Sequence, residues 1–359
     1  MAIGAVIFSH GFLLADSSTR SARAISYTAG YLGGLGVAIF FAISGYLITT
    51  LLLRENAESG RISLRGFYVR RAFRILPPAY VYLGVLFLLG KPLAKGEFAS
   101  AAFFYSNYWA DRTWWTQHFW SLSMEEHFYL LWPGALALLG ISGALRAAGV
   151  AICAILLWRP WSLAHLALPF PALQRTDMRL DAFLFAGVLA VALHGGGGQG
   201  VVGDMTRALT KVLTSGWFRL AGWMALTAVS AWSLAGSAPA IGTLLQSALL
   251  PLLLVSVVLW PGSAIYRFLE WAPVRWIGRI SYGLYLWQQL FLVGHSQPTL
   301  AAAAAAFLPR VAMIFAVATV SYYLMERRLL HYGRSLSARF ARSPSAPPLA
   351  FAKRTSSMM

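Results

Sequence analysis

Long apolar runs recur along the chain, and short polar or basic segments separate them. About 20 apolar residues are needed for an α-helix to cross the hydrocarbon core of a bilayer. The pattern predicts about ten membrane-spanning helices, at residues 1–15, 31–53, 76–90, 118–140, 144–158, 178–194, 217–236, 241–260, 277–295 and 306–325. The expected fold class is therefore all-α, a polytopic bundle of transmembrane helices.

The composition agrees with a membrane protein. Hydrophobic residues make up 58% of the 359 positions and charged residues only 11%, and the mean hydropathy is +0.62. So few polar side chains could not cover the surface of a soluble domain of this size.

The formal net charge of +17 at pH 7 raises the possibility of nucleic-acid binding. The order of the basic residues along the chain argues against it. With the N-terminus in the cytoplasm, most of the 29 Lys and Arg residues fall on the cytoplasmic side, which is the usual bias of membrane proteins. We expect both termini in the cytoplasm, and we attribute the excess charge to topology and to affinity for anionic lipid.

One transmembrane domain is predicted over residues 1–335. The Ser- and Pro-containing basic segment 336–359 predicts a disordered cytoplasmic tail. The first span has no basic residue before His10, so we expect it to be incomplete at its N-terminal end. The single cysteine, Cys153, excludes an intramolecular disulfide, and no metal site is predicted.

The densest polar chemistry lies near the start of the run from Phe119 to Pro133. Steps of three and four residues place several polar side chains on one side of a helix there. They are His118, Ser121, Glu125 and Tyr129. An acid inside the hydrocarbon is a functional candidate because it is costly to bury. The alternative is an interfacial helix end, with Trp120 and Trp132 at the headgroups and Glu125 and Glu126 in water.

Two further features could carry chemistry. His10 stands alone in the first apolar run, either as a hydrogen-bonded structural residue or as a base. After the second span come Arg70, Arg71 and Arg74, of which the first and last would share a helix face. Their guanidinium groups could hold phosphates, or they could serve only to fix the topology.

Several segments together resemble the acyltransferase 3 family of integral membrane acyltransferases. They are Gly36–Thr49, Phe67–Pro77, Phe119–Pro133, Met178–Phe185 and Leu269–Trp287. Glu326 matches the acid that closes the last span of that family. The segments follow in the family's order, and the resemblance covers the chain to about residue 335.

The resemblance implies roles for individual residues. His10 matches the histidine taken as the general base that activates an acceptor hydroxyl. Glu125 matches the acid of the family's Trp-Ser-Leu-x-x-Glu pattern. The residues that match the donor-binding segment are Arg70, Arg71 and Arg74. Further site candidates are Ser44, Tyr46, Trp120, Ser121, Arg179, Asp181, Tyr285 and Glu326.

The resemblance also implies the reaction. We expect an acyl group, acetyl in the first instance, to pass from acyl-coenzyme A to a hydroxyl of a cell-surface glycan or a similar acceptor. Acyl-coenzyme A is then a co-substrate, and no permanently bound cofactor is expected. The expected location is a bacterial-type inner membrane. Family acceptors include surface polysaccharides, lipopolysaccharide, peptidoglycan and some small secondary metabolites, and the sequence leaves the choice open.

The chain departs from the family pattern in three places. The basic residue that usually stands eleven positions before the histidine would precede Met1. Ala38 stands where the family often has an acid, and Gln288 stands where it often has a histidine after Tyr-Leu-Trp. Of these, the first bears most directly on donor binding.

Two other functions are compatible with the sequence alone. A proton-coupled transporter or flippase could use intramembrane acids and His10, although no inverted repeat is visible. A scaffold without catalytic activity is the third possibility. For the enzyme, Glu125 and Glu126 should point about 100° apart on a helix, so only Glu125 is expected to face the site. Arg179 or His10 could be its partner.

Overall fold

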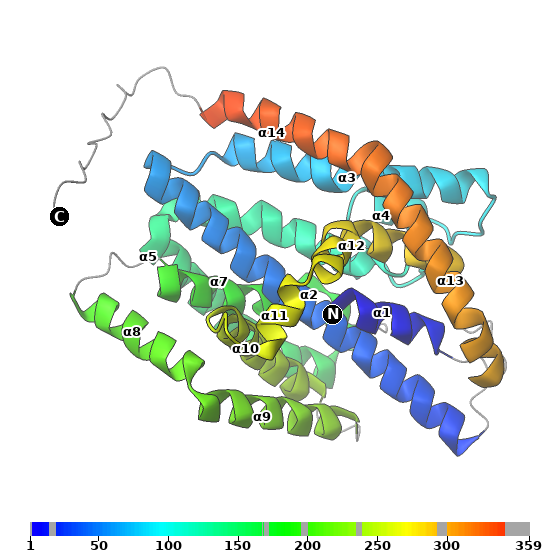
Figure 1. Ribbon diagram of the computed structural model, residues 1–359, viewed down its shortest axis with the longest axis horizontal. Helices are drawn as coiled ribbons and strands as arrows, with labels where there is room; N and C mark the ends of the chain where they lie inside the picture. Colours follow the sequence, from blue (N-terminus) through cyan, green and yellow to red (C-terminus); the bar gives the residue numbers. More distant parts are fainter. Residues whose placement is uncertain are drawn as a thin grey trace, which may run out of the picture.

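The structure is a computed structural model, and it describes residues 2–13, 19–166, 168, 172–194, 200–234, 239–292 and 300–341. Within these ranges every regular element is helical (Figure 1). The elements are α1 (Ala2–Gly11), α2 (Arg20–Ser59), α3 (Leu64–Leu88), α4 (Glu97–Ala102), η1 (Ser106–Tyr108), η2 (Trp114–Thr116), α5 (Phe119–His165), η3 (Ala172–Gln174), α6 (Thr176–Arg179), α7 (Asp181–His194), α8 (Gly200–Thr214), α9 (Gly216–Leu234), α10 (Pro239–Val258), α11 (Ala264–Glu270), α12 (Ala272–Phe291), α13 (Leu300–Ser321), the π-helical turn η4 (Tyr322–Glu326) and α14 (Arg327–Ala341).

The predicted all-α class is confirmed for the described residues, and most described residues of each predicted span lie in a helix. Five helical stretches are long and apolar enough to cross a membrane, at Arg20–Ser59, Leu64–Leu88, Trp114–His165, Ile241–Val258 and Ala301–Phe340. The shorter apolar helices are α1 and α7. The number of crossings and the cytoplasmic placement of both termini stay predictions.

The two predicted spans at 118–140 and 144–158 are the halves of α5, which breaks at Gly140. Gly140 has φ 67° and ψ 178°, a conformation that residues with a side chain rarely adopt. His127 before the break and Trp158 after it both contact α6, so the chain reverses direction at this glycine. The boundary predicted between these two spans is therefore caused by the backbone conformation of Gly140.

Helix α2 is the central element of the bundle and contacts α1, α5, α7, α9 and α10. A glycine permits the closest of these approaches, because a side chain at Gly45 would collide with the backbone of Phe183 in α7. Around this contact, the ring of Phe183 lies 4.4 Å from that of Phe41 and 4.8 Å from that of Phe128. This aromatic layer joins α2, α5 and α7 in the main hydrophobic core.

The basic segment after the second span is the first half of α3, so it is a helix continuous with the predicted third span. Helix α14 lies alongside α3, as Figure 1 shows, and the Phe73 and Tyr332 rings meet at 5.4 Å. Because α14 reaches Ala341, the predicted start of the disordered tail at residue 336 falls within it. Residues 342–359 and the glycine run at 195–198 lie outside the described residues.

Candidate active site

Glu125 is buried between α5 and α2. Its carboxylate accepts a hydrogen bond from Ser44 Oγ at 3.0 Å and another from the hydroxyl of Tyr129, one turn along α5. The predicted polar side of α5 therefore exists at Glu125 and Tyr129. Ser44, selected within the second-span motif, supplies the contact from the neighbouring helix.

Of the three candidate donor-binding arginines, only two lie near Glu125. The Arg71 guanidinium stands 4.8 Å from the centre of the Tyr129 ring, and both Arg71 and Arg74 act electrostatically on Glu125. Arg70 instead forms an ion pair with Glu55 of α2 at 3.0 Å. Arg70 therefore has a different partner from the other two, and the donor-binding role of all three stays a prediction.

The other two acids of this region lie on the same side of the bundle. Oε1 of Glu126 is buried without a hydrogen-bond partner, and Glu126 is within electrostatic range of Arg71 and Glu125. Glu326, in the π-helical turn, accepts from Ser321 Oγ at 2.9 Å and is within range of Arg74. Glu126 is therefore near the same arginine but shares none of the hydrogen bonds of Glu125, and the expectation that only Glu125 faces the site stays a prediction.

A second polar group lies about one turn before Glu125, at the N-terminal end of α5. Ser121 Oγ is hydrogen-bonded to the Tyr285 hydroxyl of α12, which also contacts the carbonyl oxygen of His118 at 3.2 Å. The Tyr285 ring stacks on Phe40 of α2 at 6.4 Å between centroids. Ser121 and Tyr285, chosen separately from the sequence, are thus brought together.

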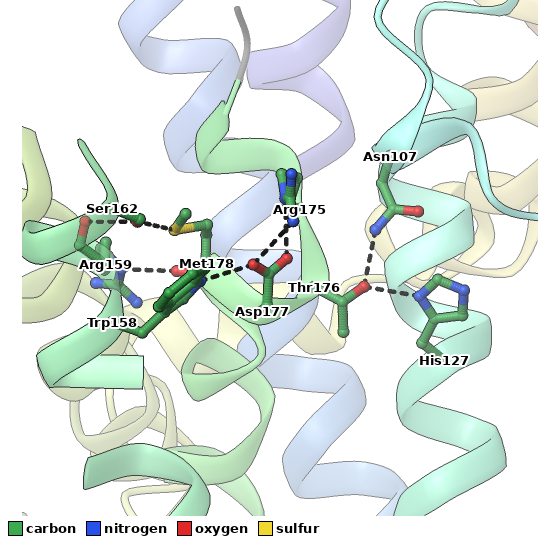
Figure 2. A network of polar contacts seen from close by, with 9 residues as sticks. All are labelled: Asn107, His127, Trp158, Arg159, Ser162, Arg175, Thr176, Asp177 and Met178. Atoms are coloured by element: carbon green, nitrogen blue, oxygen red, sulfur yellow. Dashed lines mark hydrogen bonds and ion pairs between the residues drawn. The ribbon is translucent and has the colours of Figure 1, made fainter. Parts of the chain in front are cut away.

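Arg179 and Asp181 do not pair with each other. Asp181 Oδ2 lies 2.6 Å from Nη2 of Arg159, and the two side chains are only 0% and 1% exposed. Arg159 Nε also donates to the carbonyl oxygen of Met178 at 2.6 Å (Figure 2). The Arg179 guanidinium instead lies 5.9 Å from the ring centre of Trp120, and its Nε is buried without a hydrogen bond.

His10 lies at the far end of this series from Arg71. Its ring meets the edge of Trp114 at 5.1 Å, and Gln288 is its polar neighbour. His10 Nδ1 and both polar atoms of the Gln288 amide are buried without a regular hydrogen bond. Two hydrogen bonds fix Trp114 to Gln289. The Trp114 Nε1 donates to the backbone oxygen of Gln289 at 3.0 Å, and the Gln289 Nε2 donates to the backbone oxygen of Trp114 at 2.7 Å.

The contacts along α2 show how far apart His10 and Glu125 lie. Ser9, next to His10, packs against Gly33, whereas Phe41 contacts Trp120 and Ser44 binds Glu125. At 1.5 Å per residue, Gly33 and Ser44 are separated by roughly 16 Å along the helix. Neither proposed partner of Glu125, Arg179 or His10, forms a hydrogen bond or ion pair with it in the described residues.

Together these groups form a polar column through the bundle, from a cationic end to a histidine end. We define the column as Arg74, Arg71, Glu125, Tyr129, Ser121, Tyr285, His118 and His10. Tyr46 lies outside it, because its hydroxyl is bonded to Nε2 of His194 at 2.8 Å. Among the described residues no group of three or more His, Cys, Asp and Glu side chains could hold a metal ion, and Cys153 is exposed on its own.

A family model described as an acyltransferase domain matches residues 1–326, which covers the whole column. The chain belongs to this acyltransferase family. It is 30% identical over 288 residues to the peptidoglycan O-acetyltransferase OatA of Listeria monocytogenes, covering 71% of this chain and 44% of that protein. It is 28% identical over 340 residues to the putative peptidoglycan O-acetyltransferase YrhL of Bacillus subtilis, covering 86% of this chain and 52% of that one.

A putative O-acetyltransferase of Staphylococcus aureus strain COL is 42% identical over a shorter stretch of 118 residues, which is 28% of this chain and 20% of that protein. The acyltransferase chain spans about half the length of the two longer matches. No solved structure matches it.

The acyltransferase also has a buried acid that the sequence analysis did not select. Glu97 of α4 is 0% exposed and accepts hydrogen bonds from the backbone nitrogen of Ala94, from both the nitrogen and the hydroxyl of Thr113, and from the hydroxyl of Thr116. Burial lowers the pKa of nearby Arg112 to about 10, while the charge of Glu97 acts to raise it. Glu97 thereby fixes the turn η2, and η2 places Trp114 against His10.

A second polar network that the sequence analysis did not select surrounds α6. Thr176 Oγ1 accepts from Asn107 Nδ2 at 2.8 Å and lies 2.7 Å from Nδ1 of His127 (Figure 2). Arg175 and Trp158 both bond the Asp177 carboxylate, at 3.0 and 2.8 Å. These contacts tie the segment 103–113 and α6 to both halves of α5. The sequence offered no periodic signal for them, because the partners come from separate segments of the chain.

Proposed function

We propose that this chain is a membrane O-acetyltransferase that moves an acetyl group from acyl-coenzyme A to a hydroxyl of a peptidoglycan-type glycan. The polar column is the single observation that carries the proposal, since it links a cationic end suited to the donor with a histidine end suited to the acceptor. The names of the OatA and YrhL relatives, both peptidoglycan O-acetyltransferases and the second of them putative, support the choice of acetyl and of glycan.

The donor is proposed to enter at the cationic end. Coenzyme A is rich in phosphate, and arginine binds phosphate through charge-assisted hydrogen bonds in a planar fork. Arg74 is exposed and Arg71 is partly so, which leaves both available to a ligand. This end is proposed to face the cytoplasm, where the basic segments of the chain are expected to lie.

The acceptor hydroxyl is proposed to meet His10. A neutral imidazole can take the hydroxyl proton, and His10 Nδ1 is buried beside Gln288 without a regular hydrogen bond. As the hydroxyl oxygen bonds to the acetyl carbon, the carbon–sulfur bond of the thioester breaks. The proton leaves finally with the thiolate as the free thiol of coenzyme A, so the step needs no further reactant.

Arg179 is the proposed binding group for the acetyl carbonyl oxygen. Asp181 is already neutralised by Arg159, so the Arg179 charge lies beside Trp120 without a close ion pair in the described part of the chain. Trp120 packs on Phe41, between the levels of Ser44 and Gly33 on α2. A cation placed there could stabilise the negative charge that develops on the thioester oxygen.

The decisive experiment compares acetylation of cell-wall glycans by mass spectrometry in cells with the wild-type chain, with His10→Ala and without the gene. We expect the gene to add O-acetyl groups and His10→Ala to abolish them while the protein still inserts and accumulates. A variant that keeps more than a few per cent of the transfer would remove His10 as the base. Glycans unchanged by the gene itself would reject the acceptor class.

The placement is proposed to be multi-pass in a bacterial-type inner membrane, with both termini in the cytoplasm. Cysteine labelling tests it with Ser63→Cys, before α3, and Thr113→Cys, before η2. We expect a membrane-impermeant maleimide to reach the first only from the cytoplasm and the second only from outside. Labelling of both from one side would contradict the placement of α3.

A further inference from the structure

The bend between α13 and α14 holds a groove of about 720 Å³ that the proposed reaction does not use. All of its lining comes from this one helical stretch. The lining residues are Tyr322, Tyr323, Arg327, Arg328, Leu330, His331 and Arg334. Three of these side chains are arginines, which stay charged at any physiological pH, and none is an acid.

The groove faces away from the donor end of the polar column. Helix α14 packs on α3 through Gly333, where an added Cβ would lie 2.8 Å from that of Phe73. At 100° per residue the groove residues Arg327, Arg328 and Arg334 lie roughly 100–220° around α14 from Gly333. A ligand in the groove is therefore on the side of α14 opposite α3 and its Arg71 and Arg74.

The surface that leads into the groove is apolar. On α13 the side chains of Leu308, Met313 and Val320 are exposed, and Leu324 in the π-helical turn is 61% exposed. Basic side chains thus follow directly after an exposed apolar helix of membrane-spanning length, with Tyr322 and Tyr323 between the two. Tyrosine is typical of the level of the lipid headgroups.

We infer that this groove binds the phosphate headgroup of an anionic lipid, whose acyl chains lie along the exposed side of α13. A lipid satisfies both halves of the surface at once, phosphate on the arginines and hydrocarbon on the apolar side chains. Soluble coenzyme A would leave the apolar half uncovered. The inference does not depend on the proposed transfer reaction.

The test is native mass spectrometry of the full chain, purified in detergent and titrated with phosphatidylglycerol or phosphatidylcholine of the same acyl chains. We expect the wild type to prefer phosphatidylglycerol at least tenfold, because each basic residue near an anionic headgroup contributes about fivefold. The triple change Arg327→Gln, Arg328→Gln and Arg334→Gln should remove that preference.

A matched triple controls for net charge. Arg267→Gln, Arg279→Gln and Arg339→Gln also removes three exposed arginines, none of which lines the groove, and should keep the preference. Arg328 is exposed and remote from α3. The single change Arg328→Gln should weaken the binding of phosphatidylglycerol roughly fivefold. It keeps the test valid if the triple variant fails to fold.

Three results would overturn the inference. They are equal binding of the two lipids by the wild type, equal loss in both triple variants, and loss of acyl-coenzyme A binding in the groove variant with displacement of the lipid by acyl-coenzyme A. The last would assign the groove to the donor.

Discussion

Ser44 of α2 donates a hydrogen bond to Glu125 of α5 at 3.0 Å, in the buried interior of the bundle. Tyr129 donates to the same carboxylate oxygen. A carboxylate with two donors and two nearby arginines is held in one position at a defined depth. In the acyltransferase this contact joins the second-span motif to the Trp-Ser-Leu-x-x-Glu motif, which are distant in sequence.

The first prediction concerns the two adjacent glutamates. Glu125→Gln replaces one acceptor oxygen by an NH₂ group and removes the charge near Arg71, so we expect most of the acetyl transfer to be lost. Glu126→Gln breaks no hydrogen bond and should keep much of the activity. Transfer rates of the two purified variants, at matched folded protein, give the comparison.

Equal losses would mean that the two acids act as one charged unit. A larger loss in Glu126→Gln would show that Glu126, and not Glu125, is the functional carboxylate. Ser44→Ala is a useful companion variant, because it removes one donor and keeps the charge of Glu125. We expect it to lower transfer less than Glu125→Gln does.

The second prediction separates the arginines of α3. Arg71→Ala with Arg74→Ala should raise the KM for acyl-coenzyme A at least tenfold, because each charge-assisted contact to phosphate contributes about 1.5–3 kcal/mol. Arg70→Ala is the matched control, since it breaks only the partly exposed ion pair with Glu55 and should leave that KM within about twofold.

Lysine at both positions should restore part of the affinity, because it keeps the charge but loses the planar fork. Donor KM values measured at saturating acceptor distinguish the variants. An unchanged KM in the double alanine variant would show that Arg71 and Arg74 serve topology alone.

The third prediction concerns the buried ion pair of Asp181 and Arg159. Asp181→Asn leaves the arginine charge buried without its partner, which typically costs about 3–5 kcal/mol. We therefore expect a clear fall in the thermal unfolding temperature in detergent. Asp177→Asn is the control, because its pair with Arg175 is about 30% exposed and contributes roughly 0–1 kcal/mol.

Arg179→Gln, compared with Asp181→Asn, tests the proposed role of Arg179. Arg179→Gln should lower kcat while leaving the unfolding temperature close to that of the wild type. The reason is that Arg179 Nε makes no hydrogen bond in the folded protein, so the substitution removes none there. Equal unfolding losses in Arg179→Gln and Asp181→Asn would make Arg179 a structural residue.

The sequence predicted what depends on local periodicity. Helical spacing placed Glu125 and Tyr129 on one side, and the boundary between the predicted spans 118–140 and 144–158 coincides with the break at Gly140. The family motifs then selected Ser44, Ser121 and Tyr285, and the structure brings each to the column.

The partners that sequence reasoning missed are those set by contacts between distant segments. The predicted span 144–158 ends just before Arg159, so that residue falls outside the predicted helices. In the structure α5 continues to His165, and Arg159 is buried against Asp181 on another helix. No periodic pattern in either segment encodes this pairing, because it arises from the reversal at Gly140 and the loop before α6.

Glu97 is a second case, and it leads to the last prediction. The acid lies in a short helix between spans, where a solvent-exposed position is the ordinary expectation. Instead it is fully buried and holds Thr113 and Thr116 on either side of Trp114. We interpret Glu97 as a positioning residue that acts on His10 through Trp114, a role that rests on the proposed transfer reaction.

Glu97→Gln keeps the side-chain volume but turns one of its acceptor oxygens into a donor group. At least one of the groups at Ala94, Thr113 and Thr116 then lacks its acceptor, at a cost of about 1–3 kcal/mol. We expect the turn η2 to loosen and kcat to fall about tenfold or more, with the KM for acyl-coenzyme A unchanged, because the donor end lies at the other end of the column. Trp114→Phe should reproduce the loss of kcat, since it keeps a ring near His10 but removes the indole that bonds Gln289. Thr116→Val, which removes a single hydroxyl, should have a smaller effect. If Glu97→Gln instead raised the donor KM, or lowered the unfolding temperature while kcat held, Glu97 would stabilise the loop without positioning the histidine end.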